Sequence, residues 1–120
     1  MELTIDNDFL SANARLLIIE GEIDVYTSPS LREQVSSLAL TGINDLVIDL
    51  AKVKFLDSTG LGVLIGALKR MREAGGNLYL IAPAARILRI FEITGLDKSF
   101  DICTTLEEAK TKVSPAVENA

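Results

Sequence analysis

Histidine is absent from the 120-residue chain, and cysteine occurs once, as Cys103. Without histidine the chain has no Ser-His-Asp or Cys-His catalytic arrangement, and it lacks the commonest ligand of transition metals. A single cysteine allows neither an intramolecular disulfide nor a zinc site made of thiolates. We therefore expect no catalytic residue, no metal and no cofactor, and we interpret Cys103 as a small buried apolar residue in a reducing compartment.

Aromatic residues make up only 5% of the chain, so leucine, isoleucine, valine and alanine have to build the core. The apolar share of 48% excludes global disorder and suits one domain. No apolar run approaches the ~18 residues of a membrane span, and the N-terminus has no signal-peptide pattern. We expect a cytoplasmic protein. The net charge of -5 disfavours nucleic-acid binding and adhesion to anionic membranes.

The first part of the sequence predicts a hairpin followed by a helix. Alternating apolar residues indicate strands over residues 3–9 and 16–23, and their short connection makes the pair antiparallel. Ser28-Pro29 predicts a helix with Ser28 as its N-cap, while Ser30 with Glu33 offers an alternative capping box. Leu31, Val35 and Leu38 form the apolar face of this helix, and Gly42 ends it.

The remaining sequence alternates strands with helices. Residues 43–50 predict a strand covered on both faces, and residues 78–81 another buried strand. The helix between them starts at residues 57–59 and ends at 75–76, with a core-facing stripe of Leu61, Leu64, Ile65, Leu68 and Met71. Pro83 opens a third helix that Gly95 closes. Residues 100–103 form a weak edge strand, and Thr105 with Glu108 caps a last helix.

Helices between strands imply right-handed crossovers and parallel pairing. We therefore predict an α/β fold in which about four helices pack on a mixed sheet of four to five strands, with an antiparallel hairpin at its N-terminus. Residues 1–113 form a single domain, and residues 114–120 a disordered tail.

The most informative stretch is DLAKVKFLDSTGLGVLIG, residues 49–66. Ser58 lies where a central strand gives way to a helix, the edge at which open α/β sheets meet their ligands, and a helix start favours an anion. Gly60, Gly62 and Gly66 weaken the helix and leave its start open to another chain. Ser58 could equally be a plain cap, and the glycines could serve close packing. The residues alone indicate an accessible hydroxyl at a helix start.

VKFLDSTGLGVLIGAL, residues 53–68, resembles the signature of STAS domains, and specifically of anti-sigma factor antagonists. Residues 21–24, Gly-Glu-Ile-Asp, resemble the family's Gly-Glu-Leu-Asp after its second strand. Residues 28–32, 91–97 and 107–109 match further segments, so the resemblance covers roughly residues 3–113. Thr59 departs from the serine that many members carry. The fold implied is a STAS-type mixed sheet.

The resemblance implies a partner-switching cycle rather than an enzyme. The unmodified antagonist binds an anti-sigma factor that is also an ATP-dependent serine kinase, and the sigma factor is released. The kinase then phosphorylates the motif serine, here Ser58, and the complex dissociates. A metal-dependent serine phosphatase restores the active form. The implied partner-binding patch comprises Asp24, Asp57, Thr59, Gly60, Leu61 and Gly62.

Three alternatives stay open. The first is a STAS domain of another branch, either a scaffold subunit of a signalling assembly or the soluble subunit of a lipid transporter. The second is an enzyme with Ser58 as nucleophile, which the sequence disfavours because it has no Gly-x-Ser-x-Gly element and no histidine base. The third is a small-molecule or nucleotide-binding module, and direct nucleotide binding is disfavoured because the sequence has no glycine-rich phosphate loop.

Overall fold

Five strands form one mixed sheet in the order β1-β2-β3-β4-β5 in the computed structural model, which describes residues 2–113. Their bounds are Leu3–Ser11 (β1), Ala14–Ile23 (β2), Asp45–Leu56 (β3), Asn77–Ile81 (β4) and Asp101–Cys103 (β5). β1 pairs antiparallel with β2, and every later neighbour pair is parallel. The α/β class, the N-terminal hairpin and the parallel crossovers are thus confirmed.

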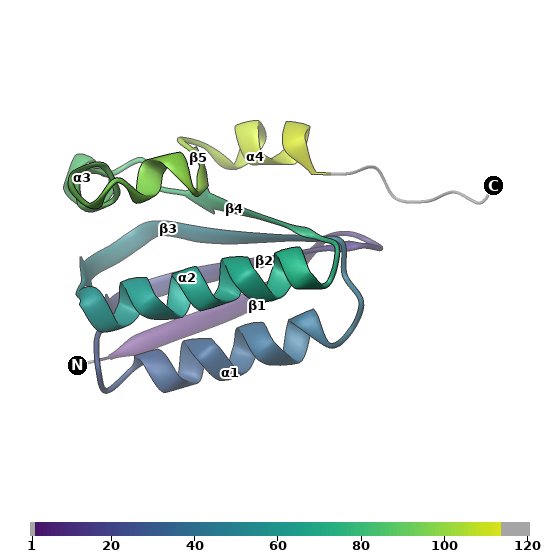
Figure 1. Cartoon of the computed structure of the whole chain (residues 1–120), viewed down its shortest axis with the longest axis horizontal. Coiled ribbons are helices and arrows are strands. Elements are labelled where there is room, and N and C mark those ends of the chain that lie inside the picture. The colour runs from purple at the N-terminus through teal and green to yellow at the C-terminus, as the bar shows by residue number, and fades with distance from the viewer. Residues whose placement is uncertain (1, 114–120) are drawn as a thin grey trace.

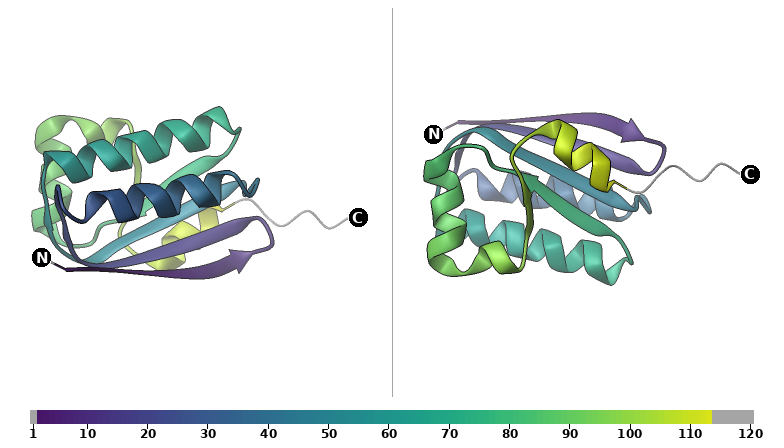
Figure 2. Two further views of the ribbon diagram at one scale, coloured as in Figure 1. Left: turned by 90° about the horizontal axis from the view of Figure 1, so that it is seen from below. Right: turned by 90° about the horizontal axis from the view of Figure 1, so that it is seen from above.

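The helices lie on both faces of this sheet. α1 (Ser28–Ala39) and α2 (Ser58–Glu73) cover one face side by side, and α4 (Leu106–Lys112) lies on the opposite face (Figures 1 and 2). α3 (Ala85–Thr94) and the short 3₁₀ helix Leu96–Lys98 lie at one end of the sheet. α3 packs against the same core as α1 and α2. Within residues 2–113, no helix has the length and apolar character that crossing a membrane requires.

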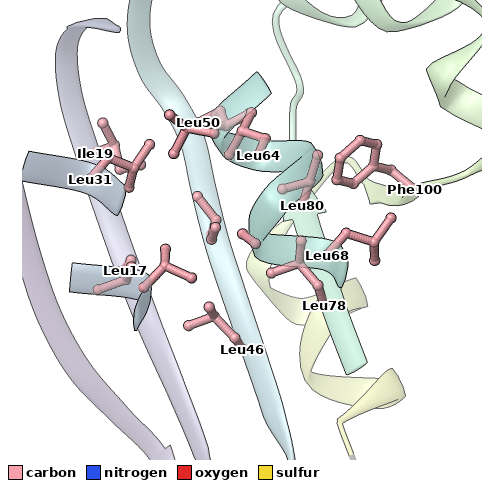
Figure 3. Close-up of a cluster of buried hydrophobic side chains, with 14 of the residues drawn as sticks. Leu17, Ile19, Leu31, Leu46, Leu50, Leu64, Leu68, Leu78, Leu80 and Phe100 are labelled. Atoms are coloured by element: carbon pink, nitrogen blue, oxygen red, sulfur yellow. The ribbon is translucent and has the colours of Figure 1, made fainter. Parts of the chain in front are cut away.

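Aliphatic side chains build the main core between the sheet and the helices α1, α2 and α3 (Figure 3). The aromatic contribution is one edge-to-face pair, Phe91 and Phe100, with ring centroids 5.5 Å apart. A smaller cluster under α4 includes Cys103 and Tyr79, and burial raises the pKa of the Cys103 thiol. The predicted aliphatic core and the predicted burial of Cys103 are both confirmed.

β3 is longer than the sequence predicted. It was expected to end near residue 50, but it continues to Leu56 and carries buried Val53 and Leu56 on its core side. Its pairing with β4 stops at Asp49, whereas its pairing with β2 runs to Leu56 with two register shifts. The second half of β3 therefore has a strand partner on one side only, and it brings the chain to the segment that contains Ser58.

Two helix starts differ from the prediction. The N-cap of α1 is Thr27, with no side-chain cap bond, so neither the Ser28 cap nor the Ser30–Glu33 box forms. Ser28 is already the first residue of the helix, and its amide donates to the Asp24 carbonyl at 2.9 Å. α3 begins at Ala85 rather than Pro83, because the Ala82 amide still donates to the Cys103 carbonyl across the sheet.

The other two helices show smaller differences. In α2 the fully buried stripe includes Val63 and Ala67, while Leu61 and Ile65, predicted to face inward, are only partly buried. At α4 the Thr105 hydroxyl accepts from the Glu108 amide at 3.1 Å as predicted, but the Glu108 carboxylate accepts from the Thr104 amide instead of closing the box on Thr105. The predicted disordered tail, residues 114–120, lies outside the described residues.

Candidate functional site

Ser58 is the first residue of α2, and its side chain is exposed. The N-cap is the preceding residue, Asp57, whose carboxylate Oδ1 accepts from the Gly60 amide at 3.0 Å. The Asp57 carbonyl accepts from the Leu61 amide at 2.9 Å. Ser58 is therefore not needed as a cap, and its hydroxyl makes no hydrogen bond to any other residue in the described range 2–113.

The glycines of the motif have different roles. A Cβ on Gly60 would lie 2.6 Å from the Ile23 Cγ2 atom and 2.6 Å from the Leu56 Cδ1 atom, so Gly60 allows α2 to rest directly on the ends of β2 and β3. A Cβ on Gly62 would meet nothing within 4 Å, and Gly62 is exposed. The opening predicted at the helix start therefore exists at Gly62, whereas Gly60 serves close packing.

Asp24 lies beside this helix start because β2 and β3 end together. Ile23 pairs with Leu56, and the Asp57 amide donates to the Ile23 carbonyl at 3.3 Å. The Asp24 side chain is only 4% exposed, however, and it is turned into its own loop. Asp24 Oδ1 accepts from the amides of Tyr26 at 2.9 Å and Thr27 at 3.0 Å.

The ionisation of Asp24 follows from these contacts. Desolvation by burial acts to raise the pKa of its carboxyl, but the hydrogen bonds from Thr27 and Tyr26 outweigh burial and hold the pKa below its ordinary value. The second oxygen, Oδ2, is buried without a hydrogen-bond partner within residues 2–113. Of the residues predicted to form the patch, Asp24 and Gly60 are buried. Ser58 and Gly62 are exposed, and the others, Asp57, Thr59 and Leu61, are partly exposed.

Sequence reasoning missed two residues at this edge. Val25 is 57% exposed and Tyr26 is 81% exposed, both in the loop between β2 and α1. They directly follow Asp24 in the loop that leaves β2, and the last residue of β2, Ile23, accepts a hydrogen bond from the Asp57 amide just before α2. A signal was available in the sequence, because Val25 and Tyr26 are an apolar pair in the short loop between β2 and α1, where turn residues are ordinarily polar.

The chemistry of this site is that of a binding surface. Among residues 2–113 no group of three histidine, cysteine, aspartate or glutamate side chains could hold a metal ion. Around Ser58 the structure brings together one uncommitted hydroxyl, the cap carboxylate of Asp57 and the free amides that a helix start leaves. The Ser58 hydroxyl is exposed, and a helix start of this kind can accommodate an anion.

Comparison with known proteins agrees with this arrangement. The sequence model of the STAS domain matches residues 8–109. The anti-sigma-B factor antagonist of Bacillus subtilis is 47% identical over 89 residues, which is 74% of this chain and 81% of that protein. An anti-sigma factor antagonist from Mycobacterium paratuberculosis is 32% identical, with a TM-score of 0.80 over 93% of this chain and 94% of its own.

A more distant solved structure shows the same fold. The Bacillus cell fate determinant SpoIIAA in its phosphorylated form is 20% identical, with a TM-score of 0.72 over 91% of this chain and 98% of its own. The antagonists are regulators rather than enzymes, in agreement with the expectation from the missing histidine. The signature around Ser58, the mixed sheet and these relatives together mean that the chain belongs to the STAS domain family, in its branch of anti-sigma factor antagonists.

Proposed function

We propose that this chain binds an anti-sigma factor while Ser58 is unmodified, so that a sigma factor is released, and that phosphorylation of Ser58 ends the binding. The observation that carries the proposal is the exposed, uncommitted hydroxyl of Ser58 at the start of α2, with Asp57 as the cap. The relatives named as anti-sigma-B factor antagonists support the choice of partner.

The anti-sigma factor in this proposal is also the kinase. The Ser58 Oγ attacks the γ-phosphorus of ATP, ADP leaves, and the hydroxyl proton passes to a base on the kinase. A metal-dependent serine phosphatase then hydrolyses the phosphoserine, which an exposed helix start leaves accessible. We place the cycle in the cytoplasm, where ATP and sigma factors are found.

A phosphate on Ser58 is compatible with the fold. It adds about -1.5 to -2 charges and three acceptor oxygens. The free amides and the dipole at the start of a helix favour such a charge by about 0.3–1 kcal/mol. The structure of phosphorylated SpoIIAA, which shares this fold, supports the same expectation. Modification therefore changes the surface and leaves the core intact.

The same phosphate is costly in a protein interface. Asp57 already places a carboxylate next to Ser58, so the added charge has no neutralising neighbour in sequence. Burying it against a partner that offers no compensating cation costs several kcal/mol. A loss of about 3 kcal/mol weakens binding roughly a hundredfold, which is enough to dissociate the complex. We propose that the contact surface around Ser58 comprises Asp57, Thr59, Leu61 and Gly62, with Asp24 and Gly60 beneath it.

The test uses the anti-sigma factor encoded in the same genome. We expect Ser58→Ala to bind it persistently in the presence of ATP, and Ser58→Asp to bind it weakly or not at all. Gly62→Glu, which adds a bulky charge at an open position, should also lose binding. Fragment mass analysis after incubation with the kinase and ATP locates the phosphate, and Thr59→Ala is the control. Phosphate on Thr59 alone, or equal affinity of the Ser58 variants, would refute the assignment.

A further inference from the structure

We propose that Tyr26, with Val25 beside it, is the apolar anchor by which the anti-sigma factor holds this surface, and that the partner meets it with an apolar pocket rather than with a cluster of lysine and arginine side chains. The inference rests on the proposed function and adds the kind of partner surface that it requires. Tyr26 is 81% exposed and Val25 is 57% exposed. Within residues 21–27 and 55–62, the segments that meet at the Ser58 edge, no other large apolar side chain is as exposed.

The position of Tyr26 is fixed by the sheet. Tyr26 follows β2 by three residues, and the last residue of β2, Ile23, is bonded through its carbonyl to the Asp57 amide. Ile23 also supports the first turn of α2 at Gly60. The loop that carries Tyr26 and the turn that carries Ser58 therefore leave the same pair of strand ends, and one partner can cover both.

The loop is held rigidly although its side chains are exposed. The Thr27 hydroxyl donates to the Glu22 carbonyl at 2.7 Å and accepts from the Asp24 amide at 2.9 Å. Asp24 Oδ1 accepts from the Tyr26 amide at 2.9 Å, and the Asp24 carbonyl accepts from the Ser28 amide at 2.9 Å. Because the backbone is ordered before binding, a partner that takes up the Tyr26 ring pays little ordering entropy.

Within residues 2–113 the Tyr26 ring has no aromatic or cationic partner. Another exposed aromatic residue, Phe9, is 70% exposed, but its ring is stacked under the Arg15 guanidinium at 4.1 Å. Tyr26 has no ring contact and no side-chain hydrogen bond to any residue in the range 2–113. Tyrosines presented in this way are typical binding hot spots, since the ring buries a large apolar area and the hydroxyl stays solvated at the rim.

The switch itself constrains the charge of the partner surface. If lysine or arginine side chains faced Ser58, a phosphate there would form charge-assisted hydrogen bonds and strengthen the complex. Phosphorylation is proposed to end binding, so charge-assisted bonds to Ser58 cannot be what holds the complex together. We infer that the affinity of the unmodified form comes from apolar burial beside Ser58, where Val25 and Tyr26 are the most exposed large apolar residues of the two segments.

The experiment measures the dissociation constant between the unphosphorylated chain and the anti-sigma factor encoded in the same genome. Tyr26→Ala should weaken binding by at least about 30-fold, the threshold of a hot spot. Tyr26→Phe keeps the ring and should stay within about threefold of the unmodified chain. Phe9→Ala removes an exposed aromatic ring at the far end of the β1–β2 hairpin and should bind like the unmodified chain. Urea unfolding of each variant checks that the fold is unchanged.

The outcomes separate the inference from the proposed function. If Ser58→Asp abolishes binding while Tyr26→Ala binds normally, the proposed function stands and the anchor is refuted. A large loss with Tyr26→Phe would mean that the hydroxyl carries the contact, which also refutes an apolar anchor. Affinity that falls steeply as salt is raised would indicate a cationic partner surface and refute the pocket. If the unmodified chain does not bind the anti-sigma factor, the proposed function fails and the inference fails with it.

Discussion

Gly60 and Gly62 are two glycines of one helix that should respond oppositely to the same substitution. In a sequence without structure both are helix-weakening residues, each about 1 kcal/mol less favourable than alanine. In the structure the Cβ of Gly60→Ala would lie 2.6 Å from atoms of Ile23 and Leu56 and 3.1 Å from the Ile23 carbonyl oxygen. The Cβ of Gly62→Ala would meet nothing within 4 Å.

The magnitudes follow from how freely the neighbours can move. Ile23 is 0% exposed and Leu56 is 5% exposed, so neither can turn away without disturbing the core. Overpacking of this kind costs about 1–3 kcal/mol. The gain in helix propensity offsets up to ~1 kcal/mol of that cost. We expect Gly60→Ala to lower the free energy of unfolding by about 1–2 kcal/mol and Gly62→Ala to raise it by about 0.5–1 kcal/mol.

Urea unfolding of the two variants beside the unmodified chain tests this difference. The two variants should differ by about 1.5–3 kcal/mol in free energy of unfolding, and thermal unfolding should separate their melting temperatures by about 6–12 °C, since 1 kcal/mol shifts the melting temperature of a domain of this size by about 4 °C. The slope of unfolding free energy against urea should be unchanged, because both variants bury the same core. If Gly60→Ala were as stable as Gly62→Ala, the close approach of α2 to the ends of β2 and β3 would be wrong.

Two further predictions concern the carboxylates beside Ser58. Because Asp57 is the N-cap of α2, Asp57→Ala should lower the free energy of unfolding by about 0.5–2 kcal/mol. Ser58→Ala should lower it by less than ~0.5 kcal/mol. If urea unfolding gave the reverse order, Ser58 would be the cap. Since the pKa of Asp24 is lower in the folded chain, its contribution to stability is complete above the pKa of the unfolded carboxyl and is lost as the pH falls through the folded pKa. Asp24→Asn should therefore flatten the acid side of a plot of stability against pH, and identical acid slopes would show that the carboxylate is not held by its loop.

The order of elements was predictable because periodicity reports burial. The buried strands β3 and β4 and the apolar stripe of α1 follow directly from the spacing of leucine, isoleucine and valine. The extension of β3 was not predictable in the same way. Its second half alternates lysine with apolar residues and pairs only with β2, so it has the pattern of a strand with one exposed face and lacks the continuous apolar run on which the prediction for residues 43–50 rested.

The site was predictable in its location but not in the roles of its side chains. Spacing alone assigned a start to α2 near residue 57, and the structure places it at Ser58. Whether Asp57 or Ser58 capped the helix depended on side-chain geometry that a sequence does not contain. The inward turn of Asp24 and the outward position of Tyr26 depend on the hydrogen bonds of one tight loop. From residue type alone, a carboxylate is expected to be exposed and an aromatic ring to be largely buried. The positions of Asp24 and Tyr26 are the reverse, so the sequence did not reveal them.

The position of β1 at the edge of the sheet has a consequence for solubility. β1 spans nine residues and has a hydrogen-bonding neighbour, β2, on one side only. Such an edge is a template for aggregation unless its side chains discourage pairing. If two molecules joined edge to edge, antiparallel about Asn7, each exposed Asp6 would face an Asp8 of the other molecule. Like charges directly opposite each other destabilise a strand pair, so Asp6 and Asp8 discourage two copies of the chain from joining through the exposed edge of β1.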